Sequence, residues 1–322
     1  GCGAIGQRHI GNLKSLGYRV SGCEKDLSRA KQVKKKYKIE IFNDLAEALT
    51  HQYDGVFICT PTSLHVPMSI EVAKRGGHLF IEKPLSNSLD KIDELLTIVN
   101  KNRLVVLVGC NTRFFPSFKL AKRLIDKNKI GKILSVKIEC GFYLPYWHPY
   151  EDYRKAYSAN KCLGGGVILD DIHEIDSLCW LFGGVKEVFC FADKMSNLKI
   201  DTEDIAEIFL KFKSGTIAQI HLDYLQRTYR RYYEFIGEKG IIIWDYIKQT
   251  VELYSGETNQ WKIFQESINT NREGMFTDEV NHFMNCIKGK ERSINDIPIA
   301  KKTLEVALAC YRSAEKKEIV HL

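Results

Sequence analysis

The sequence lacks the patterns that mark cysteine-stabilised or linker-rich proteins. Its ten cysteines are scattered without a C-x-x-C pair, so neither a disulfide framework nor a zinc site is indicated. Cys59, Cys110 and Cys179 fall within apolar runs, where we expect small core residues in a reducing compartment. With only 7 prolines and no repeat or biased segment, no linker is indicated either.

Long apolar runs and tracts of one charge are absent too. No apolar stretch approaches the length of a membrane span, and no basic-then-apolar leader precedes the first glycine, so we expect a cytoplasmic protein without a membrane partner. The net charge is +7, but the cations are scattered among nearly as many acids, which does not indicate nucleic acid. The densest basic stretch, Lys31 to Lys38, is expected to be the solvated face of a surface helix.

The chain is long enough for two domains of ordinary size. It has 322 residues, 44% of them hydrophobic, so two domains can each bury a core. An initiator methionine is lacking, and so is the apolar strand that should lead into the first glycines. We therefore expect the sequence to begin inside that strand, so that the first domain has a truncated first strand.

Short apolar runs alternate with helical segments over the first third of the chain. Such runs between crossover helices are typical of a parallel sheet buried on both faces. The sequence therefore predicts an α/β, doubly wound domain over residues 1–119. The expected strands are Tyr18–Glu24, Ile39–Phe42, Gly55–Thr60, His78–Glu82 and Leu104–Cys110, and the expected helices are Gln7–Leu16, Leu27–Lys36, Asp44–Leu49, Ser63–Arg75 and Ser88–Asn100.

After about residue 120 the pattern changes to longer strands that alternate between apolar and polar side chains. Residues 120–322 are predicted to form an α+β domain with an open, mostly antiparallel sheet, which binds the substrate. Because its own helices leave one sheet face uncovered, we expect a homodimer or homotetramer through this sheet. The expected strands are Ile133–Tyr143, Ile205–Phe212, Thr216–Tyr224, Tyr232–Ile236, Ile241–Trp244, Val251–Tyr254 and Trp261–Phe264, and the expected C-terminal helices are Thr277–Lys288 and Ile299–Ala314.

The chain opens on a G-x-G-x-x-G turn. Such a turn lets the backbone approach a pyrophosphate, and the helix that follows offers free N–H groups and a positive dipole end. With the strands and helices that follow, this predicts a Rossmann domain that binds a nicotinamide dinucleotide. The residues expected to touch it here are Gly1, Gly3, Ala4, Ile5 and Gly6.

Glu24 closes the second strand, where an acid would accept hydrogen bonds from an adenosine ribose. This favours NAD as the cofactor. The alternative is that Lys25 and Arg29, just beyond, bind the 2′-phosphate of NADP and that Glu24 is a surface acid, so NADP stays open.

Two further segments follow buried strands at the carboxyl edge, where ligands bind in open sheets. Thr60 and Pro61 are expected to line the nicotinamide side, and His65 either contacts the cofactor or caps a helix. Glu82 and Lys83 end the next strand, and Pro84 favours an extended conformation for the lysine. In a dry pocket beside the cofactor, a lysine can have a lowered pKa and exchange a proton with a hydroxyl.

The segment Gly164–Phe182 predicts a helix with one core face and one reactive face. Asp170 and His173 lie near each other, opposite the apolar stripe. Because residues three apart on a helix are neighbours, Asp170 can orient the imidazole while the other ring nitrogen takes a proton. Asp171 and Asp176 are alternatives for this orienting role.

A structural interpretation of His173 stays open, namely a buried histidine satisfied by Asp176 or Glu174. No metal is predicted, since Asp170, His173 and Glu174 lack a second histidine at ligand spacing.

An aromatic segment, Tyr143 to Arg154, leads toward Lys161. Its Trp147 suits the face of a sugar, whereas Arg154, Lys161 and Arg227 suit an anionic group. The alternative is a packed surface loop. Arg113 is expected near substrate or cofactor, because the sixth strand ends just before it.

Together these motifs resemble the glucose-fructose oxidoreductase, inositol dehydrogenase and rhizopine-catabolism family, and the likeness covers nearly the whole chain. The matching segments are Gly1-x-Gly3-x-x-Gly6-x-x-His9, Thr60-Pro61, Glu82-Lys83-Pro84, Asn111-x-Arg113-Phe114, Gly164-Gly165-Gly166 ahead of Asp170 and His173, and Glu279-Val280-Asn281-His282-Phe283.

The resemblance implies that Lys83 and His173 flank the carbon that loses or gains hydride, with Asp170 beside them. It implies an NAD(P)-dependent oxidoreductase acting on a secondary alcohol or ketone of a sugar derivative. The family more often spaces the aspartate and histidine four apart, and the Asp-x-x-His spacing found here resembles a sugar-nucleotide or amino-sugar subgroup. With the aromatic segment, it favours such substrates over free inositols or hexoses.

Two other functions stay open. A transient oxidation at one carbon could activate elimination or glycoside cleavage at another, with no net turnover of cofactor. A non-catalytic nucleotide-sensing protein could have kept the fold and lost the reaction, although the intact Lys83, Asp170 and His173 argue against it.

Overall fold

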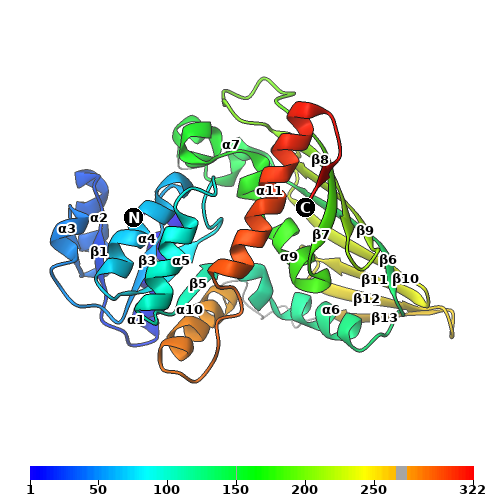
Figure 1. Cartoon of the computed structure of the whole chain (residues 1–322), viewed down its shortest axis with the longest axis horizontal. Coiled ribbons are helices and arrows are strands. Elements are labelled where there is room, and N and C mark those ends of the chain that lie inside the picture. The colour runs from blue at the N-terminus through cyan, green and yellow to red at the C-terminus, as the bar shows by residue number, and fades with distance from the viewer. Residues whose placement is uncertain (150, 266–273) are drawn as a thin grey trace. The chain divides into compact units, whose positions relative to one another are not determined.

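The computed structural model describes residues 1–149, 151–265 and 274–322 (Figure 1). The chain divides into two compact units. The first consists of Gly1–Asn111 and Glu273–Lys301, and the second of Thr112–Arg272 and Lys302–Leu322. In the described part of the chain, no helix combines the length and the apolar character that a membrane crossing needs.

The first unit holds two parallel sheets and their crossover helices. The apolar run of β4 is buried from Leu79 to Glu82, as expected for a strand covered on both faces. The predicted parallel, doubly wound sheet is therefore confirmed. One sheet pairs β1 (Ser21–Cys23) with β2 (Glu40–Phe42), and the other has the order β3 (Gly55–Ile58), β4 (His78–Glu82), β5 (Val106–Gly109). The helices are α1 (Ala4–Ser15), α2 (Leu27–Tyr37), α3 (Leu45–Ala48), α4 (His65–Lys74), α5 (Ile92–Lys101) and α10 (Gly274–Ile287).

The core of the first unit contains residues from both of its chain segments. Leu13, Phe80 and Leu107 pack in one cluster with Val280 and Phe283 of α10. The N–H of Val108 also donates to the carbonyl of Asn295 at 2.8 Å. The second segment of this unit thus completes a core that the first 111 residues begin.

The second unit is built on one nine-stranded sheet. Neighbouring strands are antiparallel except for β6 and β9, which confirms the prediction of a mostly antiparallel sheet. The order is β13 (Gln260–Gln265), β12 (Thr250–Ser255), β11 (Gly240–Asp245), β10 (Arg230–Gly237), β6 (Ile133–Gly141), β9 (Ile217–Asp223), β8 (Ile205–Phe212), β7 (Val185–Asp193), β14 (Val320–His321). The helices are α6 (Pro116–Asp126), α7 (Leu144–Trp147), α8 (Val167–Asp170), α9 (His173–Phe182) and α11 (Ile297–Lys316), which begins in the first unit.

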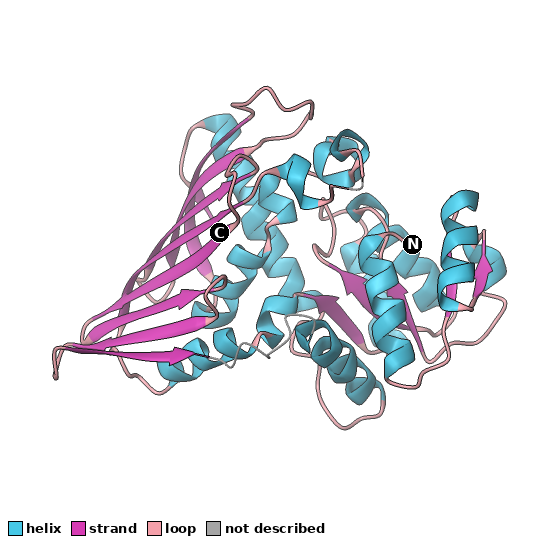
Figure 2. Cartoon of the chain, turned by 180° about the vertical axis from the view of Figure 1, so that it is seen from behind, coloured by secondary structure: helices cyan, strands magenta, loops and turns pink. Residues whose placement is uncertain are grey.

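Helices cover only one face of this sheet. Figures 1 and 2 show α6, α9 and α11 on the same side, and no helix of the described chain on the other. On the covered side, the N–H of Cys190 in β7 donates to the hydroxyl of Ser313 in α11 at 3.0 Å. On the open face, the side chains of Phe191 and Ile217 are 60% and 52% exposed.

Several elements differ from the expected ones. Helix α1 begins at Ala4 rather than Gln7, and β7 was not expected. The single helix expected over Gly164–Phe182 is two helices, α8 and α9. At the break the backbone of Asp171 turns to ψ 33°, and the N–H of Glu174 pairs with the carbonyl of Asp171, only three residues back.

Candidate active site

The glycine turn of the first unit is shaped by two close backbone contacts. A Cβ on Gly1 would lie 2.6 Å from the carbonyl oxygen of Cys59, and one on Gly6 would lie 2.2 Å from the carbonyl oxygen of Gly1. A side chain at Gly1 would therefore push the turn away from the end of β3, and one at Gly6 would push the start of α1 away from Gly1. Among the described residues, only its chain neighbours come within 4 Å of a Cβ built on Gly3. The turn is thus closely packed at Gly1 and Gly6 and has free space beside Gly3.

The open side of the turn coincides with the start of α1. Gly3 is the N-cap of this helix and supplies no side-chain cap, and Ala4 and Ile5 form the first turn. Backbone N–H groups and the positive end of the helix dipole thus face a space that a Cβ would occupy. This arrangement fits the pyrophosphate of a dinucleotide.

Glu24 lies directly after β1 and is buried. Its Oε2 accepts the N–H of Cys2 in the glycine turn at 2.8 Å, and its Oε1 accepts the N–H of Asp26 at 2.9 Å. Arg29 is one of the two cations that could bind the 2′-phosphate of NADP. Its guanidinium is 3.5 Å from Oε2, so it already faces a carboxylate. An anionic group fixed beside the glycine turn favours ribose hydroxyls over a phosphate.

His65 links the two loops that follow β3 and β4. It is 1% exposed, and its Nε2 is 2.9 Å from the carbonyl oxygen of Thr60, while its Nδ1 is 2.7 Å from that of Pro84. Burial lowers the pKa of His65, against the two backbone contacts, which favour the charged ring. Pro61 follows Thr60 and precedes the short helical turn Thr62–Leu64, so the loop reverses direction there.

Lys83 follows β4 and is half-buried. The carboxylate of Glu82 bridges two groups, since Oε1 lies 2.6 Å from Nε2 of His9 and Oε2 accepts the N–H of Lys83 at 3.2 Å. The Lys83–Pro84 peptide bond is cis. Lys83 thus lies at the carboxyl edge of the sheet. The side chain of Glu82 before it contacts the buried His9, and the carbonyl of Pro84 after it contacts the buried His65.

In the second unit Asp170 is held by two tyrosine hydroxyls. Tyr157 donates to one carboxylate oxygen and Tyr224 to the other, the latter at 3.1 Å. Burial raises the pKa of Tyr224 well above its usual range, so it remains a donor. Asp170 is 7% exposed. The two hydroxyls fix the orientation of this carboxylate.

His173 is the first residue of α9 and is 8% exposed. Of the aspartates considered as its partner, Asp176 is engaged elsewhere: it accepts two hydrogen bonds from Arg113 at 2.8 Å and one from Thr303 at 3.4 Å. Within the described chain its hydrogen-bond partners do not include His173. Asp170 and Asp171 remain as candidates.

The aromatic segment packs against the sheet. Trp147 is 44% exposed, and its ring centroid lies 4.4 Å from that of Phe142 and 5.3 Å from that of Tyr229. Residue 150 of this segment lies outside the described residues. Trp147 therefore presents part of a flat apolar surface to solvent while its position is fixed by neighbouring rings.

The three cations expected to bind an anionic group of the substrate differ in how they are paired. Arg154 makes two hydrogen bonds of 2.8 Å to Asp152, so a carboxylate already neutralises it. Arg227 lies over the ring of Tyr143, 3.7 Å from its centroid, and Lys161 is exposed. Neither side-chain cation forms an ion pair with a carboxylate in the described part of the chain, although the backbone N–H of Lys161 donates to Asp201.

One group of side chains has the composition of a metal site. Single ligand atoms of Cys140, Asp171 and Glu174 lie within 4.8 Å of one another. However, Nε of Arg231 lies 2.7 Å from Glu174, and burial raises the pKa of the Cys140 thiol well above its usual range. The contact with Arg231 occupies the Glu174 carboxylate, so a buried ion pair accounts for this group without a metal ion.

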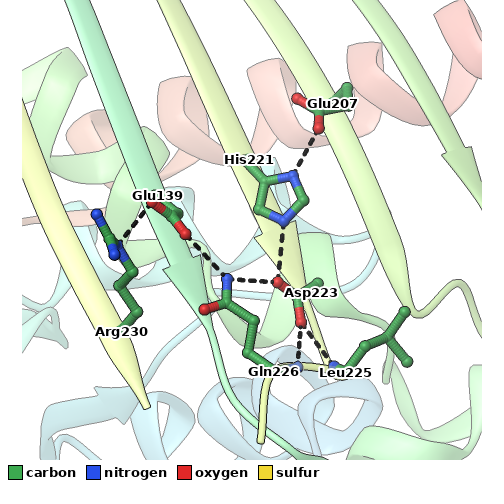
Figure 3. A network of polar contacts seen from close by, with 7 residues as sticks. All are labelled: Glu139, Glu207, His221, Asp223, Leu225, Gln226 and Arg230. Carbon is green, nitrogen blue, oxygen red and sulfur yellow. Dashed lines mark hydrogen bonds and ion pairs between the residues drawn. The ribbon is translucent and has the colours of Figure 1, made fainter. Parts of the chain in front are cut away.

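A polar network occupies the open face of the sheet (Figure 3). His221 of β9 contacts Glu207 of β8 at 2.5 Å and Asp223 at 2.9 Å. The hydrogen bond to Asp223, followed by that to Glu207, raises the pKa of His221 to about 9 despite partial burial. With a carboxylate at each nitrogen, the ring donates twice as an imidazolium. The network continues through Gln226, Glu139 and Arg230.

Sequence reasoning missed several residues around these sites. His9 stood within a quoted motif but received no role, and its contact with Glu82 joins positions 73 residues apart. Tyr157 and Tyr224 carried no signal, because nothing in their local sequence distinguishes them from other aromatic core residues. The spacing G-x-G-x-x-G-x-x-H is the one pattern that could have pointed to His9.

Comparison with known families accounts for both units. A family described as an oxidoreductase family with an NAD-binding Rossmann fold matches residues 1–110, and the GFO/IDH/MocA C-terminal domain matches residues 118–243.

Individual relatives cover nearly the full chain. The scyllo-inositol 2-dehydrogenase (NAD(+)) of Bacillus subtilis is 30% identical over 97% of this chain and 92% of its own length. The myo-inositol 2-dehydrogenase of Thermotoga maritima is 28% identical over 100% of this chain and 97% of its own length. A solved structure of the WlbA dehydrogenase from Bordetella pertussis, in complex with NADH and UDP-GlcNAcA, has the same fold: the TM-score is 0.84 at 21% identity, over 100% of this chain and 97% of that one.

Proposed function

The chain belongs to the GFO/IDH/MocA family of oxidoreductases, and from this membership we propose the roles of its two domains and of its site residues. It is an NAD-binding enzyme acting on the CH–OH group of sugar-like substrates. We assign cofactor binding to the Rossmann domain within residues 1–119, and substrate binding and self-association to residues 120–322. The reaction is the transfer of a hydride between NAD and a secondary alcohol or ketone of a sugar derivative.

One observation carries the assignment of the cofactor side. In the first unit, three segments meet at the carboxyl edge of the parallel sheet: the glycine turn packs on Cys59, and His65 contacts the carbonyls of both Thr60 and Pro84. Bound ligands lie at this edge in open α/β sheets. The residues that would hold the cofactor are Gly1, Gly3, Ala4, Ile5, Gly6, Glu24, Thr60, Pro61, His65, Glu82 and Lys83.

Lys83 and His173 are proposed to exchange the hydroxyl proton of the substrate. The nicotinamide, when bound, accepts or supplies the hydride, so the protein needs only to orient the substrate and move one proton. A lysine ammonium and an imidazole can both transfer a proton near neutral pH when their surroundings adjust the pKa. Asp170, oriented by Tyr157 and Tyr224, is the proposed third member of the catalytic group.

For the substrate, we propose a sugar nucleotide or an amino sugar. The Asp170-x-x-His173 spacing and the exposed ring of Trp147 support this class, as do Lys161 and Arg227, whose side chains are not paired with a carboxylate in the described chain. Arg113 and Arg154 are less available to substrate, since each makes a bidentate contact to an aspartate.

A cyclic polyol is the second candidate substrate. The specific observation in its favour is that two full-length relatives, at 28% and 30% identity, are inositol dehydrogenases. A polyol needs no cation for a diphosphate, so substitution of Lys161 and Arg227 would leave its turnover unchanged. The same substitutions would raise the KM of a sugar nucleotide.

The test is the absorbance of the reduced nicotinamide with free sugars, inositols, amino sugars and sugar nucleotides. Lys83→Met is expected to lower kcat by about 10² to 10⁴ fold, the usual contribution of a general acid or base. Lys101→Met, an exposed lysine at the end of α5, is the matched control and should keep full activity. Unchanged kcat in Lys83→Met would remove the lysine from the mechanism.

Two further outcomes bear on the alternatives. Tight NAD binding with conversion of a sugar but no change in absorbance would indicate the redox-neutral cleavage or elimination reaction. Tight NAD binding with no conversion of any substrate would favour the nucleotide-sensing protein.

A further inference from the structure

We propose that His9 and His65 are positioning residues that fix Lys83 for proton transfer. His9 acts through the Glu82 carboxylate, and His65 acts through the Pro84 carbonyl. The inference rests on the proposed role of Lys83, and all of these residues belong to the first unit.

The His9 side of this arrangement is a buried relay. His9 is 1% and Glu82 8% exposed, and their contact of 2.6 Å is in the range of a charge-assisted hydrogen bond. Nδ1 of His9 has no hydrogen-bond partner in the described chain. Because a carboxylate oxygen only accepts, Nε2 of His9 is the donor in this hydrogen bond. The second carboxylate oxygen then accepts the N–H of Lys83.

The surroundings of the pair are apolar. The ring of His9 lies among those of Phe57, Phe80 and Phe276, at centroid distances of 5.2, 4.9 and 6.5 Å. A hydrogen bond shielded from water in this way is stronger than one at the surface. Gly109 pairs with Glu82 across β4 and β5 and leaves space for the ring of Phe80, since a Cβ there would lie 3.0 Å from that ring.

The His65 side holds the residue after Lys83. Both ring nitrogens face backbone carbonyl oxygens, which only accept, so the ring can act only as a donor here. The shorter of the two contacts, 2.7 Å from Nδ1, is the one to Pro84. Because His65 itself follows the Thr60 loop, this hydrogen bond ties that loop to the Lys83 loop.

The consequence concerns the freedom of Lys83. A lysine side chain has four carbons and many rotamers, so a shift of its backbone also shifts the positions that its ammonium can reach. Catalytic groups need to be held within about 0.5 Å of their productive position, and a misplacement of about 1 Å can cost about 100-fold in rate. Anchors on Glu82 and Pro84 limit the backbone of Lys83 from both sides.

The kinetic experiment compares His9→Leu and His65→Leu with His78→Leu. His78 lies at the opposite end of β4, and its Nδ1 accepts the N–H of Val105 at 2.9 Å. His78→Leu therefore also removes a hydrogen bond between a β4 side chain and the backbone. We expect kcat to fall at least tenfold in His9→Leu and in His65→Leu, and to stay within about twofold in His78→Leu. In His9→Leu, whose side chain is not among the proposed cofactor contacts, the KM of NAD should stay within about threefold. His9→Gln, whose amide can donate to Glu82, should recover part of the loss.

A second readout does not depend on activity. After reductive methylation with ¹³C, the NMR signal of Lys83, identified by its absence in Lys83→Arg, should shift in His9→Leu and His65→Leu but not in His78→Leu. If His9→Leu does not fold, Glu82→Gln tests the same link, because the amide keeps the volume and loses the charge. The same loss of kcat is expected, and full activity would overturn the inference.

The outcomes separate the two proposals. If Lys83→Met is inactive while the histidine variants behave like His78→Leu in both readouts, the inference is wrong and the proposed function stands. If Lys83→Met retains turnover, the proposed function of the lysine is wrong, and the NMR signal alone decides whether the histidines fix it.

Discussion

Arg113 shows how a charged side chain that follows a strand can be buried in an ion pair. Its position after the last strand of the first unit suggested a place near substrate or cofactor. In the structure it is 1% exposed and bound through two hydrogen bonds to Asp176, which is equally buried. Removing one partner of such a pair leaves the other charge uncompensated, at a typical cost of about 3 to 5 kcal/mol.

Glu24 offers a test of cofactor choice. We expect Glu24→Gln to lower kcat/KM for NAD by about 10- to 100-fold, since hydrogen bonds to a charged group contribute about 1.5 to 3 kcal/mol. Activity with NADP should rise, because the charge that repels a 2′-phosphate is gone while Arg29 remains nearby. The measurement is the ratio of kcat/KM for the two cofactors.

The amide of Glu24→Gln keeps an acceptor oxygen for the N–H of Cys2, which limits disturbance of the glycine turn. Asp44→Asn, an exposed N-cap acid at the start of α3, serves as the control for loss of one negative charge. An unchanged preference for NAD in the Glu24 variant would contradict the ribose contact.

At this scale the sequence predicts residues but not their partners. Thr60, Lys83 and Glu24 could be singled out because each follows a recognisable strand, and strand ends gather at one edge of a parallel sheet. The contact of His65 with Pro84 and that of Tyr224 with Asp170 join positions 19 and 54 residues apart. Such pairings depend on how whole elements pack, which no local pattern records.

Among the elements, β7 was missed for a physical reason. Its pairing with β8 shifts register between Val185 and Glu187, so its apolar side chains do not alternate regularly. The opposite error occurred at Gly164–Phe182, where a regular apolar stripe predicted one helix. The turn at Asp171 and Ile172 is invisible to that periodicity, because the stripe continues through it.

Strand β9 carries a prediction about stability and pH. The pKa of His221 is raised to about 9 from its usual 6.5 by its two carboxylate neighbours, and the wider network also holds Glu139 and Arg230. Because the folded pKa is above the unfolded one, the charged ring stabilises the fold fully below pH 6.5. This contribution is lost as the pH rises through about 9.

Urea denaturation of wild type and His221→Gln at several pH values measures this effect. The difference in unfolding free energy is expected to be about 1 kcal/mol at pH 6, reduced by solvent screening, and to vanish near pH 10. His321→Gln, in the exposed end of β14, should show no such trend. A difference that grows with pH would contradict a charged His221.

For the whole molecule, the open face of the nine-stranded sheet supports the proposed self-association. Phe191, Phe209 and Ile217 are 60%, 41% and 52% exposed and lie on three adjacent strands, β7, β8 and β9. Adjacent apolar side chains of this size mark interaction sites more often than isolated ones do. We expect Ile217→Glu to convert a dimer or tetramer into monomers at micromolar concentration, measured by sedimentation velocity.

Leu27→Glu is the matched control, because Leu27 is 61% exposed but lies on α2 in the first unit. It should leave the sedimentation coefficient unchanged. A monomeric wild type, or an Ile217→Glu protein that sediments like wild type, would show that this face does not join subunits.

The return of the chain to the first unit bears on the order in which the protein is made. The aromatic core around Phe80 needs Val280 and Phe283, and the edge of β5 needs Asn295, all of which leave the ribosome after the whole nine-stranded sheet except β14. The nascent first unit therefore exposes part of its core while some 160 further residues are synthesised. During that interval the growing chain depends on chaperones, or on a partly formed parallel sheet, to avoid aggregation.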